Sequence, residues 1–146
     1  MIAQTIQLAL APVFLLVAIG SIMNILTTRY GRVVDRSREL QRLYGETSGA
    51  EHQMIVNEIR ATDKRIVLIG SAMKVLVMSG LAVGLTVTLL FFAAFVGEQV
   101  FYAAAAFFLI AIALLMWGLL HFLRETQLAA SLLRIPRELL ELEKKG

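Results

Sequence analysis

The sequence predicts an all-α integral membrane protein with three transmembrane helices. Three long apolar runs contain almost no charged residues, and we place the spans at about residues 5–27, 68–96 and 100–123. Each is long enough to cross a hydrocarbon core, which takes about 20 residues of α-helix. The chain of 146 residues is 58% hydrophobic, and its Lys and Arg residues are concentrated between the first two runs and in the tail. This length allows a single membrane domain over residues 1–146 and leaves no room for a separate soluble enzyme domain.

The distribution of charge predicts how the spans are oriented. Eight basic residues lie between positions 28 and 65, five follow His121, and none lies in the turn at residues 97–99. Cytoplasmic loops carry the excess of Lys and Arg, so we expect the basic segments in the cytoplasm and the N-terminus outside. A cleaved signal peptide is the alternative for the first run, but it requires a basic segment before the apolar stretch. Here Arg29 and Arg32 follow the run instead, so we expect the first span to be retained.

Residues 28–66 are predicted to form a cytoplasmic helical hairpin that continues the first two spans. Apolar positions recur there at steps of three and four residues, which places them along one side of each helix. The candidate packing seam consists of Val33, Leu40, Ile55 and Ile59. The glycines of residues 45–49 are expected to form the turn.

The tail, residues 124–146, is predicted to be an amphipathic helix. Its leucines fall on one side and its charges on the other, and Pro136 is expected to start a new helical segment. Such a helix lies either on the membrane surface or against the hairpin.

Two segments carry a resemblance to a known family. They are Ala11–Pro12 followed by Phe14–Leu15–Leu16 in the first span, and Arg32–Arg38 shortly after it. With the charged hairpin and two further spans, the chain resembles, over nearly its whole length, the bacterial membrane-protein family catalogued as domain of unknown function 2721. The resemblance implies the three-span topology and a place in the bacterial inner (plasma) membrane, and it implies no catalytic residue.

The sequence offers little for enzyme chemistry, so we predict no enzyme activity, no cofactor and no metal site. There is no Cys, and the two histidines, His52 and His121, lie far apart in the chain. Metal sites need clustered His, Cys or carboxylate ligands, and phosphate-binding and hydrolase motifs are missing as well. The acidic residues other than Glu98 lie beside basic residues, where we expect solvated or paired surface charges. This mixture of charges also argues against nucleic-acid binding, which favours an uncompensated basic face.

Polar residues on the first span suggest either a pore or a helix contact. Gln7, Phe14 and Ser21 recur every seven residues and therefore share one face of the helix. They are candidate pore-lining residues, with Phe14 as an apolar constriction, or they are contacts that hold helices together. Lys74 is the one ionisable residue inside an apolar run. It is a further pore candidate, or its side chain extends to the headgroups.

The favoured function is that of a small homo-oligomer, because three helices have difficulty enclosing a polar path alone. Gly80 and Gly84 are candidates for close helix packing. The expected partners are the lipid bilayer, further copies of the chain, and anionic lipids attracted by the basic hairpin. We favour an ion channel lined by the first span, with the hairpins as vestibule or gate. The alternative is a non-conducting scaffold or sensor whose hairpins bind lipid or protein.

Overall fold

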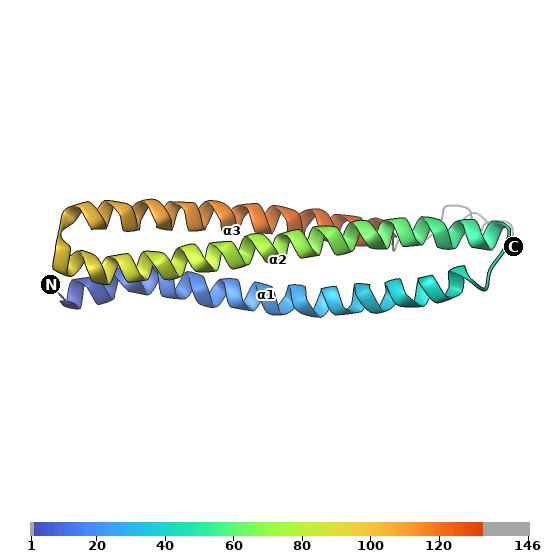
Figure 1. Ribbon diagram of the computed structural model, residues 1–146, viewed down its shortest axis with the longest axis horizontal. Coiled ribbons are helices and arrows are strands. Elements are labelled where there is room, and N and C mark those ends of the chain that lie inside the picture. Colours follow the sequence, from blue (N-terminus) through green and yellow to red (C-terminus); the bar gives the residue numbers. More distant parts are fainter. Residues whose placement is uncertain (1, 133–146) are drawn as a thin grey trace, which may run out of the picture.

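The computed structural model describes residues 2–132 as three long helices. They are α1 (Ile2–Tyr44), α2 (Ala50–Val96) and α3 (Glu98–Leu132). All three are long and apolar enough to cross a membrane, which confirms the predicted all-α fold with three spans. In Figure 1, α2 lies between α1 and α3, and the two turns are at opposite ends of the molecule. α2 packs against both neighbours, whereas α1 and α3 barely touch.

A glycine with positive φ borders α2 at each of the two turns. The predicted turn at residues 45–49 is present, and Gly49 has φ +73°. Between α2 and α3 the turn is shorter than expected, because Gly97 alone reverses the chain with φ +118°. Its backbone N–H donates to the Ala93 carbonyl at 3.0 Å. A side chain is strained at such positive φ values, and glycine avoids this cost.

The contact between α1 and α2 repeats every seven residues. On α1 the buried stripe is Pro12, Ile19, Leu26, Val33 and Leu40. On α2 the buried residues include Ile55, Thr62, Ile69, Leu76, Val83 and Leu90. A seven-residue repeat keeps one face of a helix against its partner, as in a coiled coil. The same packing therefore runs from the membrane spans into the hairpin without a change of register.

The stripe that α3 presents to α2 is made of small residues. Ala104, Ala111 and Gly118 are buried at seven-residue intervals. The buried Ser79 hydroxyl donates to the Ala111 carbonyl at 2.7 Å. A Cβ at Gly118 would lie 2.9 Å from the Leu76 side chain. Small residues let helix backbones approach closely in a membrane, and Gly118 marks the tightest point of this contact among the glycines of the described chain.

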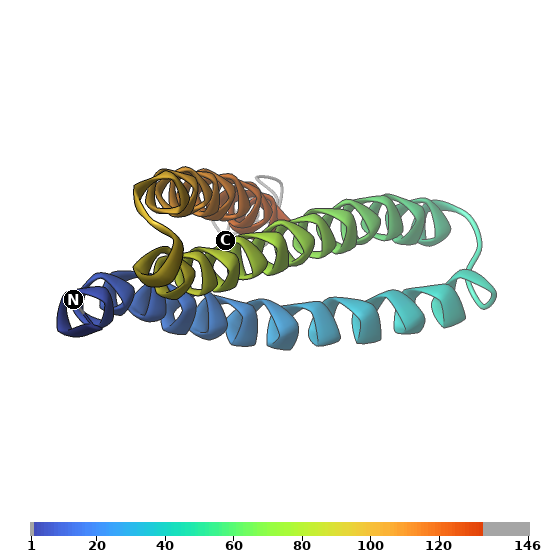
Figure 2. The ribbon, with the colours of Figure 1, turned by 60° about the vertical axis from the view of Figure 1, so that its left-hand side comes forward.

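In Figure 2, α1 and α2 continue beyond the last described turn of α3 and form the predicted hairpin. Val33, Leu40 and Ile55 are buried, and Ile59 is half-buried. The side of the membrane on which the hairpin lies stays a prediction. Residues 124–132 of the expected tail continue α3 as one helix. The rest of that tail, with Pro136, lies outside the described residues.

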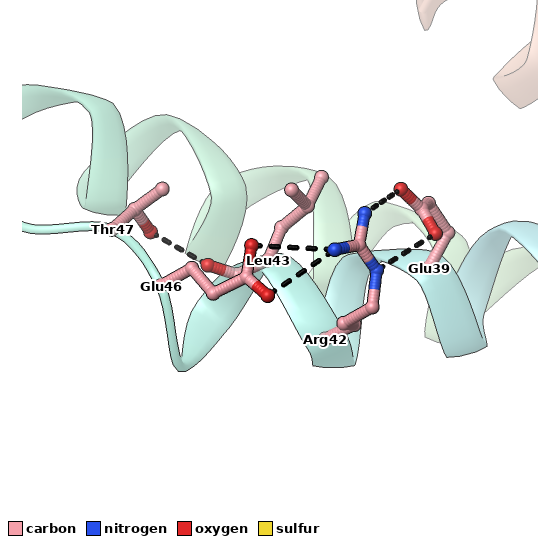
Figure 3. Close-up of polar contacts among 5 residues, drawn as sticks. All are labelled: Glu39, Arg42, Leu43, Glu46 and Thr47. Carbon is pink, nitrogen blue, oxygen red and sulfur yellow. Dashed lines mark hydrogen bonds and ion pairs between the residues drawn. The ribbon is translucent and has the colours of Figure 1, made fainter.

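Ion pairs brace the end of α1 next to the turn (Figure 3). The Arg42 guanidinium donates to Glu39 at 2.7 Å and to Glu46 at 3.2 Å. These contacts hold the pKa of the Glu39 carboxyl below its ordinary value, chiefly through the hydrogen bond from Arg42 and also through its charge. The Thr47 hydroxyl donates to the Leu43 carbonyl at 3.0 Å and so satisfies a group at the helix end.

Candidate functional site

A fully buried carboxylate lies where the three helices meet. Glu125 follows Ala104, Ala111 and Gly118 on the α3 stripe, seven residues after Gly118, and its exposed fraction is 0%. A small residue at the earlier stripe positions lets α3 approach α2 closely. The same spacing carries the Glu125 side chain into the interior, although it is charged.

Both carboxylate oxygens of Glu125 are paired with arginines, one from each of the other helices. The Arg29 Nη1 of α1 donates to Oε2, and the Arg65 Nε of α2 donates to Oε1 at 3.1 Å. Arg29 also lies 3.4 Å from the Thr126 hydroxyl, and its guanidinium lies 5.3 Å from the centre of the Phe122 ring. Glu125 is thereby a direct link between α1 and α3, which otherwise hardly touch.

Helix periodicity brings the two arginines to this point. Arg65 lies seven residues before Ala72, which is itself seven residues before Ser79, and both of these are buried against the other helices. Arg29 lies three residues after the buried Leu26. Residues three, four or seven apart share a face of a helix. Arg29 therefore lies beside the buried stripe of α1, and Arg65 lies on the face of α2 that carries Ala72 and Ser79. Arg29 and Arg65 lie within three residues of the predicted span ends at residues 27 and 68, so the prediction puts the Glu125 centre next to a membrane boundary.

The charges of the centre do not cancel. Two guanidinium groups face one carboxylate, which leaves one positive charge. Removing one partner of a buried ion pair typically costs about 3–5 kcal/mol, because a charge is left without compensation. Glu125 is the member that depends on the pairing, since the Arg29 and Arg65 side chains keep 33% and 25% of their surface exposed.

His121 lies one turn before Glu125 on α3. Its Nδ1 is buried and has no hydrogen-bond partner among residues 2–132. Its ring lies edge-on to Trp117, with 5.9 Å between the ring centres. Within the described residues, no group of three or more His, Cys, Asp or Glu side chains could hold a metal ion.

Sequence reasoning missed the burial of Glu125. We expected the acidic residues of the basic segments to be solvated or paired at the surface; Glu125 is paired, but it is not at the surface. The physical reason is the close approach of α3, which excludes water from the fourth position of its stripe. The spacing of Ala104, Ala111, Gly118 and Glu125 was the available signal.

The candidate pore residues of α1 lie away from the other helices. Gln7, Phe14 and Ser21 are exposed, and they fall on the face opposite the Pro12–Leu40 stripe. Phe14 has 69% of its surface exposed. Lys74 is also exposed, but it borders a groove with Met23 beside the α1–α2 contact. Within one chain, Lys74 therefore does not lie beside the row of Gln7, Phe14 and Ser21 on α1.

The two glycines expected to pack helices differ in their surroundings. A Cβ at Gly80 would lie 3.7 Å from Leu16 Cδ1 of α1, an ordinary contact distance. A Cβ at Gly84 would meet nothing within 4 Å. Gly80 therefore lies against α1, while Gly84 faces open space in a single chain.

Three apolar helices long enough to span a bilayer make the chain a multi-pass membrane protein. A family model described as "protein of unknown function (DUF2721)" matches residues 9–135. The chain belongs to this family, as its sequence resemblance implied. Comparisons with curated proteins and with solved structures give no match.

Proposed function

We propose that the protein is a homo-oligomeric ion channel of the bacterial inner membrane, in which the outer face of α1 lines the path. The observation that carries the proposal is the polar stripe on that face, by which we mean the row of Gln7, Phe14 and Ser21. Gln7 and Ser21 lie on a surface of α1 that no other helix of the described chain covers. The stripe would contact lipid in a monomer, whereas in an oligomer it contacts water or other copies.

The cost of leaving this surface in lipid supports an oligomer. The side-chain amides of Gln7 and Asn24 form no hydrogen bond with residues 2–132, and both residues are exposed. An unsatisfied amide in hydrocarbon costs several kcal/mol. Ser21 differs, because its hydroxyl donates to the Val17 carbonyl of its own helix at 3.2 Å. Contact with water or with another copy would satisfy the two amides.

Phe14 supplies the gate in this proposal. It lies between Gln7 and Ser21 on the same stripe, and its ring is largely exposed. Around a symmetry axis the Phe14 rings would form an apolar constriction, which closes a path by excluding water. The hairpins of α1 and α2 would then surround the cytoplasmic mouth.

Conductance of the reconstituted protein tests this proposal. Phe14→Ser should raise the current, because a smaller and more polar ring stays wet. Leu109→Ser is the matched control, since Leu109 on α3 has 67% of its surface exposed and is not on the stripe. Lys74→Glu should move the reversal potential towards cation selectivity if Lys74 lines the cytoplasmic mouth. Absence of current from the wild type and both Phe14→Ser and Lys74→Glu, in protein shown to be assembled, would refute the channel.

The proposed orientation places the hairpin in the cytoplasm and the N-terminus outside. Its support is the excess of Lys and Arg in the hairpin, which cytoplasmic segments carry. The sequence contains no Cys, so single cysteines can report the topology. In intact cells an impermeant thiol reagent should label Glu98→Cys and not Ser48→Cys. The opposite pattern would reverse the orientation.

The alternative is a non-conducting scaffold or sensor, and the ion pairs of the hairpin favour it. Arg36 of α1 donates to Glu58 of α2 through two nitrogens, at 2.9 and 2.7 Å. Exposed pairs of this kind add about 0–1 kcal/mol each, so their contribution to stability is small, and their charged groups are available to a partner. An assembled but electrically silent protein whose hairpin retains a lipid or protein partner would support this alternative. Neither function assigns a catalytic role to the chain.

A further inference from the structure

We infer that the Glu125 centre is a binding site for the phosphodiester group of an anionic lipid. The inference does not depend on whether the protein conducts ions. It concerns Arg29 and Arg65, which hold Glu125 and still have unused hydrogen-bond donors. The carboxylate positions the two guanidinium groups, and the phosphate binds to their outer edges.

Each arginine uses a single nitrogen to hold Glu125. Arg29 donates through Nη1, and Arg65 donates through Nε. A purely structural pair commonly uses the guanidinium fork, with two parallel N–H donors on one carboxylate. Here the remaining nitrogens, Nε and Nη2 of Arg29 and Nη1 and Nη2 of Arg65, have no acceptor among residues 2–132. These unused donors belong to two side chains held together by one carboxylate.

The exposed fractions of the three side chains show which of them a ligand can reach. Glu125 is completely buried, whereas Arg29 and Arg65 keep about a third and a quarter of their side-chain surface exposed. The carboxylate therefore forms the inner wall of the centre. Both arginine side chains can be reached from outside the three described helices, and we place the phosphate against their exposed part.

Charge selects the ligand. Two guanidinium groups and one carboxylate leave one positive charge, which one phosphodiester would neutralise. An inorganic phosphate dianion would leave an excess of negative charge beside the buried Glu125 carboxylate. The centre thus matches a singly charged phosphodiester better than a dianion, and an arginine pair is well suited to phosphate oxygens.

The location of the centre favours a lipid over a soluble phosphodiester. Arg29 and Arg65 lie at the expected ends of the first two spans, where the headgroups of one leaflet begin. Trp117 and Leu123, on the same helix as Glu125, have 58% and 51% of their surface exposed. They would contact the acyl chains while the phosphate binds the arginines.

The single Trp of the chain makes the inference testable. Trp117 lies eight residues before Glu125, which separates the two by about 12 Å along the helix axis. The full-length protein is reconstituted in phosphatidylcholine vesicles, and Trp117 fluorescence is compared after adding equal fractions of brominated phosphatidylglycerol or brominated phosphatidylcholine. The wild type should prefer phosphatidylglycerol by about fivefold, which is about 1 kcal/mol.

Two variants with the same net charge separate the site from general attraction. The triple variant Arg29→Gln, Arg65→Gln, Glu125→Gln lowers the net charge by one and leaves no buried charge without a partner. Arg60→Gln lowers it by the same amount at an exposed position of α2 that forms no ion pair with the described residues. The triple variant should lose the preference, and Arg60→Gln should retain it. Equal effects of the two variants, or a preference that survives in the triple variant, would overturn the inference.

A third variant keeps the inference falsifiable if the triple variant does not fold. Glu125→Gln removes the negative charge but retains an oxygen that accepts from an arginine. The centre then carries two positive charges, so the preference for phosphatidylglycerol should increase. An unchanged or reduced preference in folded Glu125→Gln protein would overturn the inference.

The source of the phosphate is tested separately. Inorganic phosphate is added in excess to vesicles that contain brominated phosphatidylglycerol, with chloride at equal ionic strength as the control. The quenching should persist equally in both. If phosphate abolishes the preference and chloride does not, the site binds a soluble anion and the lipid assignment is wrong.

Discussion

Arg65→Gln should destabilise the protein more than any neighbouring surface substitution. The variant leaves Glu125 buried with Arg29 as its one remaining cationic partner. Breaking a buried ion pair costs about 3–5 kcal/mol. Because Arg29 still pairs with Oε2 and only the donor to Oε1 is lost, we expect a loss near the lower limit, about 3 kcal/mol.

A second substitution should restore much of this loss. In Arg65→Gln the buried Oε1 of Glu125 has lost its donor. Adding Glu125→Gln replaces the buried carboxylate by a neutral amide, whose oxygen still accepts from Arg29. The double variant should therefore be more stable than Arg65→Gln alone, by about 1–2 kcal/mol. This recovery distinguishes a buried charge from a mere loss of side-chain packing.

The free energy of unfolding, measured by helix content during titration of the solubilised protein with denaturing detergent, checks both expectations. Arg60→Gln is the control, and it should change stability by less than about 0.5 kcal/mol. The reasoning is refuted if Arg65→Gln is no less stable than this control. It is also refuted if the double variant is less stable than Arg65→Gln.

Three further substitutions test packing and charge. Gly118→Ala should lower the free energy of unfolding by about 1–3 kcal/mol, because the new methyl group would lie 2.9 Å from a leucine of α2. Gly84→Ala is the control: nothing lies within 4 Å of its Cβ, so it should be close to neutral in the same unfolding titration. Leu40→Asp should cost at least about 2 kcal/mol, since Leu40 is fully buried in the hairpin, and an unchanged unfolding curve would show that the seam is not a packing face. The lowered pKa of Glu39 means that its pair with Arg42 stabilises the folded state above the ordinary value of 4.5 and ceases to do so as the pH falls through the lowered value. A small loss of stability in acid should thus occur in the wild type and be reduced in Glu39→Gln; identical acid profiles would contradict this.

The helices and the first turn could be predicted because each depends on local sequence. Long apolar runs specify spans, and the glycines of residues 45–49 interrupt the helix between the two arms of the hairpin. The hairpin seam follows in the same way, since Val33, Leu40 and Ile55 repeat with helix periodicity and all three are buried. These features need no knowledge of how distant segments meet.

The Glu125 centre could not be predicted because it depends on the register between helices. The seven-residue spacing after Ala104, Ala111 and Gly118 places Glu125 on the α3 stripe, but it does not show which residues would pair with a buried carboxylate. Its environment is set by residues 60 and 96 positions away, Arg65 and Arg29. The tight contact at Gly118 could not be predicted for the same reason, because its partner lies on another helix. Gly118 also has no second glycine four residues away, as Gly80 and Gly84 have.

Disulfide formation between single cysteines tests most directly whether the outer face of α1 is the surface that copies share. The native chain has no Cys, so each variant reports one position. In oxidised native membranes Phe14→Cys should form disulfide-linked dimers, because the proposed channel places Phe14 at the axis of an oligomer. Leu109→Cys, about equally exposed on α3, should stay monomeric. A monomeric Phe14→Cys, or equal cross-linking at both positions, would contradict the assignment of this face.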